Sequence, residues 1–360
     1  MKTLVEVLTA AGKPTKVVRT ADGTRVLVLP YGGRVLGLFS PRSDENFYWT
    51  HDALRSVATA RAFYARDHWH NSGGDRTWLA PEIDLFFPDF PNRARYVQPR
   101  ALDPGNYVVT AAGEDFALVN RLSVTFSRTR LEVGLEIAKS FGPAPNPLRH
   151  ERGLDLAGLE FAGYTQYTSL SLIGTDAAAS APVGLWNLVQ MPHGGALLIP
   201  TYSRAEPRPI MGSVPVADLR VSDHLVVYRM RQEGEHKIAI RAVATTGRVG
   251  YLYASGEHWA LIVRNFMVDP SGEYVDVPWD NPAERGYSTQ ACNVNSALGR
   301  FSELEYHIPA IGGDTRRTRC ADAAQVWAFR GAPESVRRVL RTLLGADASV
   351  AGLLSASSTR

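Results

Sequence analysis

Three ionisable side chains recur at every second position near the C-terminal end of the sequence. The segment from Phe301 to Ala310 reads FSELEYHIPA, and it carries Glu303, Glu305 and His307. In an extended strand these side chains share one face, because successive side chains alternate between the two faces. The other face is apolar or aromatic. Burying an isolated charge is costly, so we expect the polar face to line either a ligand site or open solvent.

A second polar and aromatic cluster lies between His68 and Glu82, where the sequence reads HWHNSGGDRTWLAPE. Its candidate substrate-binding residues are Asp75, Arg76, Trp78 and Glu82. The adjacent Gly73 and Gly74 let the backbone approach a ligand closely, so we interpret the segment as a binding loop. Aromatic faces and charged groups together suit a sugar. The alternative is a structural turn in which Asp75 and Arg76 only connect neighbouring strands.

The same segment contains a His-x-His pattern. In an extended chain His68 and His70 can present two imidazoles to one metal ion, and Glu82 or His307 could complete the site. Two nearby histidines more commonly hydrogen-bond to the backbone or to a carboxylate. We therefore expect no metal, and His70 remains a candidate proton donor.

The segment from Gly184 to Pro200 reads GLWNLVQMPHGGALLIP. Trp186 and Gln190 carry groups that suit recognition of hydroxyls, although they could equally satisfy strand ends. His193 precedes a Gly-Gly turn that leads into an apolar strand. Its ordinary pKa near neutrality makes it a candidate general acid, and a solvated turn residue is the alternative. A later segment containing Trp279 and Asp280 could form a rim, but a hairpin with surface charge explains it better.

Composition narrows the classes of partner. Hydrophobic residues make up 45% of the 360 residues, charged residues make up 21%, and the formal net charge is +3. These are ordinary values for a globular protein, and they predict neither a nucleic-acid partner nor a membrane partner. A small, largely neutral molecule fits better. Motifs for phosphate loops, dinucleotides, nucleophile elbows and zinc ribbons are lacking, so we expect no cofactor.

The termini and cysteines suggest a compartment. The N-terminus lacks the apolar region of a signal peptide, and no run of about 18 apolar residues predicts a transmembrane helix. An isolated pair of cysteines, Cys292 and Cys320, is more often two reduced thiols than a disulfide. Together these features lead us to expect a cytoplasmic protein.

Short alternating runs separated by turn residues dominate the chain and predict antiparallel sheets. The predicted strands are Thr24–Leu29, Tyr107–Thr110, Phe116–Phe126, Arg130–Ala138, Ser169–Ile173, Ala196–Ile199, His224–Arg231, Lys237–Val243, Gly250–Ala254, Trp259–Phe266 and Gly272–Val277. A helix is expected within Thr50–Arg66, capped near Thr50 or Asp52, and two terminal helices within Asp322–Leu344. We expect an all-β fold, a large antiparallel β-sandwich with a few peripheral helices. Residues 1–345 should form one domain, and residues 346–360 a flexible tail.

Several of these segments together resemble a known family. The turn Tyr31–Val35 (YGGRV), the segment Trp186–Leu188 (WNL) and the Glu-Leu-Glu strand at Glu303 are similar to the galactose mutarotase-like (aldose 1-epimerase) β-supersandwich superfamily. More narrowly, GGDRTWLAPE and FSELEYHIPA look like motifs of uncharacterised bacterial members. The likeness covers roughly residues 15 to 315.

The resemblance implies a concave sheet face that binds a pyranose. One glutamate would remove the proton of the anomeric hydroxyl while a histidine protonates the ring oxygen. By position, Glu303 or Glu305 would be the base, and His193 or His70 the acid. The chain departs from the epimerases ahead of Trp186, where their Asn-His pair is missing.

We therefore expect a carbohydrate-binding protein whose ligand is a small sugar. The enzymatic activity that we expect is that of an isomerase of the aldose 1-epimerase type. A non-catalytic sugar-binding or sensing module is the first alternative. An accessory domain for polysaccharide lyase or hydrolase chemistry is the second. The sequence leaves the sugar and the oligomeric state open.

Overall fold

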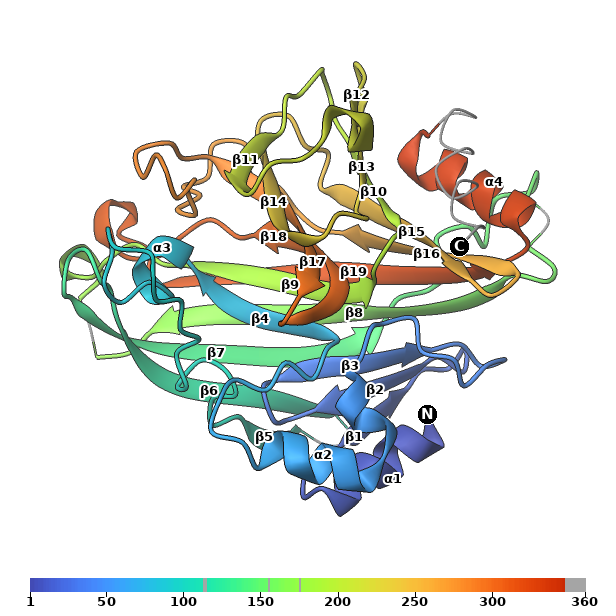
Figure 1. The fold of residues 1–360 in the computed structure, drawn as a ribbon, viewed down its shortest axis with the longest axis horizontal. Helices are drawn as coiled ribbons and strands as arrows, with labels where there is room; N and C mark the ends of the chain where they lie inside the picture. Colours follow the sequence, from blue (N-terminus) through green and yellow to red (C-terminus); the bar gives the residue numbers. More distant parts are fainter. Residues whose placement is uncertain (113–114, 155, 175, 347–360) are drawn as a thin grey trace.

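The computed structural model describes residues 1–112, 115–154, 156–174 and 176–346. These residues form nineteen strands and four α-helices, and the strands build two large antiparallel sheets. Figure 1 shows strands of one sheet crossing in front of strands of the other, with the helices at the periphery. The predicted antiparallel β-sandwich with a few peripheral helices is confirmed. Of the predicted tail, residues 346–360, all but Ala346 lie outside the described residues.

The first sheet has nine strands and contains the strand with the alternating ionisable residues. Its order is β1 (Lys16–Arg19), β2 (Arg25–Leu29), β3 (Arg34–Phe39), β4 (Asp75–Ala80), β9 (Gly184–Pro192), β18 (Gly299–His307), β17 (Tyr287–Ser296), β14 (Gly234–Arg241) and β11 (Arg208–Met211). The central strand, β9, comes from the middle of the chain and lies between β4, from the first quarter, and β18, from the last quarter.

The second sheet has ten strands. Its order is β12 (Leu219–Val221), β13 (Leu225–Arg229), β10 (Ala196–Pro200), β15 (Arg248–Ser255), β16 (His258–Asn265), β19 (Arg319–Gly331), β8 (Glu160–Leu172), β7 (Glu132–Pro143), β6 (Asp115–Thr125) and β5 (Val108–Ala112). The main apolar core lies between the sheets, with residues from Val26 in the first to Ala328 in the second. One continuous core thus holds the two sheets together.

The helices differ from the prediction near the N-terminus. The predicted helix within Thr50–Arg66 consists of a 3₁₀ turn, Asp52–Arg55, followed by α2 (Val57–Tyr64). The Ser56 hydroxyl accepts a hydrogen bond from the Thr59 amide, so the helix begins later than either predicted cap. A further helix, α1 (Lys2–Ala10), is absent from the predicted elements, and it packs with α2 beneath β2 and β3 (Figure 1).

The prediction of the first of the two C-terminal helices is wrong. Residues from Arg319 to Gly331 form β19, and α4 covers only Pro333–Leu344. In β19, Val326 packs into the core between the sheets, while Trp327 and Phe329 pack beneath α4. Because both faces of the strand are buried, its apolar residues are nearly continuous and imitate a helical pattern.

Two further segments differ from their predictions. The predicted binding loop between His68 and Glu82 contains a central strand, β4, and leads into the short helix α3 (Glu82–Leu85). Every residue of β4 is buried, which explains why its polar and aromatic residues do not show a two-sided pattern. The predicted strand Gly272–Val277 is an irregular connection, although Tyr274 and Val277 are buried.

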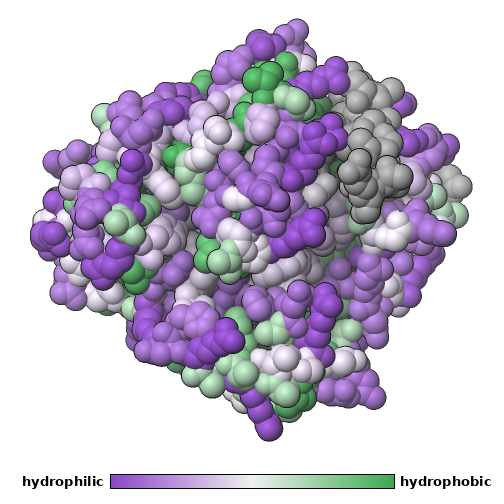
Figure 2. All heavy atoms as spheres, in the orientation of Figure 1, coloured by the Kyte–Doolittle hydropathy of each residue, from purple (hydrophilic) through white to green (hydrophobic). Residues whose placement is uncertain are grey.

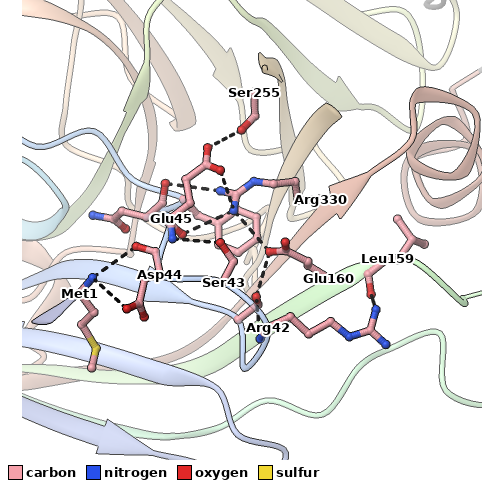
Figure 3. A network of polar contacts seen from close by, with 12 residues as sticks. Met1, Arg42, Ser43, Asp44, Glu45, Leu159, Glu160, Ser255 and Arg330 are labelled. Carbon is pink, nitrogen blue, oxygen red and sulfur yellow. Dashed lines mark hydrogen bonds and ion pairs between the residues drawn. The ribbon is translucent and has the colours of Figure 1, made fainter. Parts of the chain in front are cut away.

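A polar network ties the loop after β3 to the second sheet (Figure 3). The buried guanidinium of Arg330 lies 3.3 Å from Glu160 Oε2 and 3.5 Å from Glu45 Oε2. It also lies over the Phe47 ring, 4.2 Å from the ring centre. The hydroxyl of Ser40 donates to Glu160, and that of Ser255 donates to Glu45. Arg330 is therefore the centre of this connection.

We expect Arg330→Met to lower the free energy of unfolding by about 1–3 kcal/mol, because Glu160 loses its cation and the backbone of the loop loses its donor. Urea denaturation measures the change. The matched control is Arg121→Met, which removes a largely exposed arginine paired with Glu136 and should change stability little. Equal effects of the two substitutions would contradict the proposed role of Arg330.

Hydrophilic residues predominate on the face shown in Figure 2, where hydrophobic residues form small separate groups. In the part of the chain that the structure describes, no helix is long and apolar enough to cross a membrane. Cys292 and Cys320 are both free thiols.

Candidate functional site

The side chains of β18 alternate between the two faces of its sheet, as predicted. Leu304 and Tyr306 belong to the core between the sheets, while Glu303 and Glu305 line a cavity on the other side of their sheet. The cavity has a volume of about 530 Å³. Its walls come from both halves of the chain and include Trp69, Arg76, Trp78, Glu82, Tyr96, Trp186, Lys237, Trp279, Cys292 and Phe301.

Glu303 is held by two side chains from neighbouring strands. Arg76 on β4 donates from Nη2 to Glu303 Oε1 over 2.8 Å, and Gln190 on β9 donates from Nε2 to the same oxygen over 2.9 Å. The Arg76 guanidinium lies 4.1 Å from the centre of the Trp78 ring. This stacking and the ion pair leave Arg76 Nε and Nη1 without a hydrogen-bond partner among the described residues. They are donors that a ligand could use.

Glu305 lies deeper and is fully buried. Its Oε2 accepts a hydrogen bond from the Trp186 indole over 2.8 Å and lies 3.2 Å from Lys237 Nζ. Burial raises the pKa of Glu305 to about 8, although the Lys237 ammonium acts in the opposite direction. Its Oε1 has no hydrogen-bond partner among the described residues. A carboxyl group that exchanges its proton near neutral pH is suited to general acid–base chemistry.

Lys237 connects Glu305 to a third carboxylate. Its Nζ lies 3.1 Å from Glu82 Oε2, and Glu82 also accepts hydrogen bonds from Tyr96 and Trp279. Burial lowers the pKa of Lys237, but Glu305, Glu82 and Asp276 together raise it above its ordinary value. Lys237 therefore stays protonated between two glutamates. Sequence reasoning missed this residue, because the only signal is one cation inside a predicted strand.

Aromatic rings form much of the remaining wall. The rings of Trp78 and Trp186 meet edge to face, with their centres 5.3 Å apart. Asp103 Oδ2 accepts hydrogen bonds from the indoles of both Trp69 and Trp78, over 3.0 and 2.9 Å. Fixed aromatic faces beside charged hydrogen-bonding groups form an amphipathic surface that suits a sugar ring.

Three predicted substrate-binding residues do not line the cavity: Gln190, which donates to Glu303, and Asp75 and His307, which lie behind the wall. Asp75 points into the core, where it lies 3.0 Å from Arg264 and accepts a hydrogen bond from Tyr164 over 2.7 Å. His307 is buried and stacks on Trp186, with ring centres 5.6 Å apart. Burial lowers the pKa of His307 well below its ordinary value, and Lys237 lowers it further, so this ring is neutral. Asp75 and His307 support the walls and do not line the cavity described above.

The two candidate proton donors also lie elsewhere. His70 hydrogen-bonds through Nδ1 to the Tyr31 hydroxyl and through Nε2 to the Arg66 carbonyl, beside α2. His193 hydrogen-bonds to Asn293 Oδ1 over 3.0 Å at the end of β9. Among the described residues no histidine lines the cavity. His70 follows α2 and His193 precedes the Gly-Gly turn after β9, and sequence spacing could not reveal that both hydrogen-bond outside the cavity.

Metal-ligating side chains come close together at one place. Among the described residues, the one group of three such ligand atoms is Cys292, Glu303 and Glu305, whose atoms all lie within 4.8 Å of one another. Neither His68 nor His70 belongs to it. Arg76 and Lys237 already neutralise the two glutamates, and burial raises the pKa of the Cys292 thiol. These features favour proton transfer over metal binding.

No family model and no curated protein matches the sequence. A galactose mutarotase related enzyme from Lactobacillus acidophilus is 8% identical with a TM-score of 0.47, and the likeness covers 87% of this chain and 96% of that chain.

Two further solved structures are similar. A galactose 1-epimerase from Lactobacillus acidophilus is 10% identical with a TM-score of 0.40, covering 88% of this chain and 94% of that chain. A protein from Synechocystis sp. PCC 6803 is 13% identical with a TM-score of 0.48, covering 89% and 95%. The structural neighbours thus include the group that the sequence resembles. The sheet order described above, and not these distant likenesses, defines the fold.

Proposed function

We propose that the protein binds a carbohydrate in this cavity and interconverts its anomers, with Glu303 and Glu305 as the acid–base pair. The observation that carries the proposal is the presence of two carboxyl groups within 4.8 Å of each other in a cavity walled by tryptophans. The hydroxyl and the ring oxygen of a pyranose are bonded to the same anomeric carbon. Two proton-transferring groups this close can therefore serve both oxygens of one sugar.

The chemistry follows from the different surroundings of the two glutamates. Glu303, paired with Arg76, accepts the proton of the anomeric hydroxyl. The bond between the anomeric carbon and the ring oxygen breaks, and protonated Glu305 supplies a proton to that oxygen. The product is the open-chain aldehyde. Rotation of the aldehyde and closure on its other face return both protons, so each glutamate regains its first state.

This proposal changes the identity of the acid. A Glu/His pair is the sequence-based expectation, but His70 and His193 are engaged outside the cavity. Glu305 replaces the histidine because its raised pKa lets it carry a proton at neutral pH. Lys237 would stabilise the carboxylate that Glu305 becomes after proton transfer.

Polarimetry with freshly dissolved α-anomers of common aldoses tests the proposal. We expect purified protein to accelerate the change in optical rotation by at least about 100-fold over the buffer rate for one or more sugars. Isothermal titration with the same sugars measures binding separately. Absence of both acceleration and binding across the panel would refute the proposal.

A non-catalytic sugar-binding module is the second candidate. It is favoured by the fact that Glu303 and Glu305 already accept hydrogen bonds from the protein, Glu303 from Gln190 and Glu305 from Trp186. In that case sugars bind saturably without acceleration, and Trp78→Ala weakens binding. Activity on a polymeric rather than a free sugar would instead indicate an accessory role in polysaccharide degradation.

A further inference from the structure

A second hollow continues from the candidate site. It has a volume of about 510 Å³, and three residues, Arg93, Met211 and Trp279, line both it and the first cavity. The residues that line the second hollow alone lie on β11, directly after it, and on the loop after Val277: Arg208, Pro209, Ile210, Gly212 and Asp280. The two hollows are therefore neighbours that share one wall.

Trp279 is the central element of that shared wall. Its indole donates a hydrogen bond to Glu82 Oε2 over 3.2 Å, and its ring meets Phe87 edge to face at 4.8 Å. It also packs against Ile210 and Tyr287. These contacts hold the ring in place while it remains partly exposed to both hollows. A fixed indole between two hollows can contact two successive rings of one ligand.

The second hollow offers polar groups for hydroxyls. Arg208 lies 2.7 Å from Asp280 and 3.1 Å from Glu284, which holds its guanidinium at the wall. Arg93 is exposed, and within the described part of the chain it forms no ion pair. Pro209, which is exposed, and Met211, which is partly exposed, supply apolar surface. Charged groups beside an apolar surface again match the two kinds of surface on a sugar.

Building on the proposed function, we propose that the second hollow binds a second sugar unit, so that the ligand is a reducing disaccharide or a longer reducing oligosaccharide. The anomeric carbon of the first unit must face Glu303 and Glu305 and must carry a free hydroxyl. The second unit is therefore linked through another carbon of the first ring. It extends past Trp279 toward Arg93 and Arg208.

Isothermal titration with matched sugars tests this inference. The probes are glucose and galactose, and the reducing disaccharides maltose, cellobiose and lactose. We expect at least one disaccharide to bind about 10-fold or more tightly than the monosaccharide at its reducing end, which is the gain of about 1.4 kcal/mol that a second set of contacts provides.

Variants locate the second unit. Pro209 is exposed and lines only the second hollow, so Pro209→Trp should fill it. We expect this variant to lose the advantage of the disaccharide and to bind the monosaccharide within twofold of the wild type. Asp280→Trp, on an exposed loop position of the same hollow, provides an independent obstruction if the first variant fails to fold. Val216→Trp, at a position 90% exposed elsewhere, is the control.

The outcomes separate the two proposals. Equal affinity for monosaccharides and disaccharides would overturn the second subsite and leave the proposed function standing. A disaccharide advantage that survives both obstructing variants would place the second unit elsewhere and would also overturn this inference. Failure of all five sugars to bind, in titrations that detect millimolar affinities, would refute the proposed function and this inference with it.

Discussion

Glu305→Gln is expected to lower the rate of anomer interconversion by about two to four orders of magnitude while sugar binding changes little. The amide keeps the size of the carboxyl group and can still contact Trp186, but it cannot donate a proton and recover it. Polarimetry measures the rate, and isothermal titration measures affinity. The control is Glu257→Gln in the exposed turn between β15 and β16, which should keep the full rate.

The pH dependence of the wild-type rate is an independent test of Glu305 as the proton donor. Because the protonated form of Glu305 donates to the ring oxygen, the protein-catalysed rate should fall as pH rises through about 8. Any residual rate of Glu305→Gln should lack this decline. A variant with the wild-type rate and the wild-type pH profile would exclude Glu305 as the proton donor.

Lys237→Met is expected to lower the free energy of unfolding by about 3–5 kcal/mol at neutral pH, because it leaves Glu82 and Glu305 buried without their shared cation. Urea denaturation followed by tryptophan fluorescence measures the loss. The control is Lys2→Met, which removes a side chain that is 85% exposed and should leave stability unchanged. Equal stability of Lys237→Met and the wild type would show that the three side chains do not form a coupled cluster.

The stability of Lys237→Met should also depend on pH in a predictable direction. Lys237 lowers the pKa of Glu305, so its removal raises that pKa further above the unfolded value. At neutral pH Glu305 is protonated in both proteins. The stability of the variant should therefore continue to fall as pH rises above about 8, where the wild-type Glu305 has released its proton and its contribution no longer changes. The double variant Lys237→Met with Glu305→Gln should recover part of the loss, because a glutamine at this position does not have to take up a proton when the chain folds. A double variant less stable than Lys237→Met alone would contradict this account.

Some of the site follows from local periodicity. Glu303 and Glu305 share the side of β18 opposite Leu304 because a strand repeats every two residues, whatever surrounds it. The same reasoning gives the class of the fold, since short alternating runs joined by turns close into antiparallel sheets. Arg76, Trp78, Glu82 and Trp186 were also identifiable, as polar and aromatic residues gathered in two short segments.

Local patterns fail where burial hides them. In β19 both faces are covered, so Val326, Trp327 and Phe329 lose the alternation that marks a half-exposed strand. The same cause conceals β4, in which Asp75 faces the core and Arg76 faces the cavity. A shift of one residue along the strand would exchange the two faces, and only the pairing with β9 establishes which residue faces the cavity.

The sequence by itself determined the antiparallel class of the fold and the two glutamates on one face of a strand, because both depend on neighbours two residues apart. Only the tertiary structure decided which distant groups meet those glutamates. Sheet order brings Lys237 to Glu305 and Arg76 to Glu303, while His70 and His193 form their hydrogen bonds outside the cavity. Contacts between strands separated by a hundred or more residues are set by how two sheets pack around a common core, and no local spacing records that arrangement.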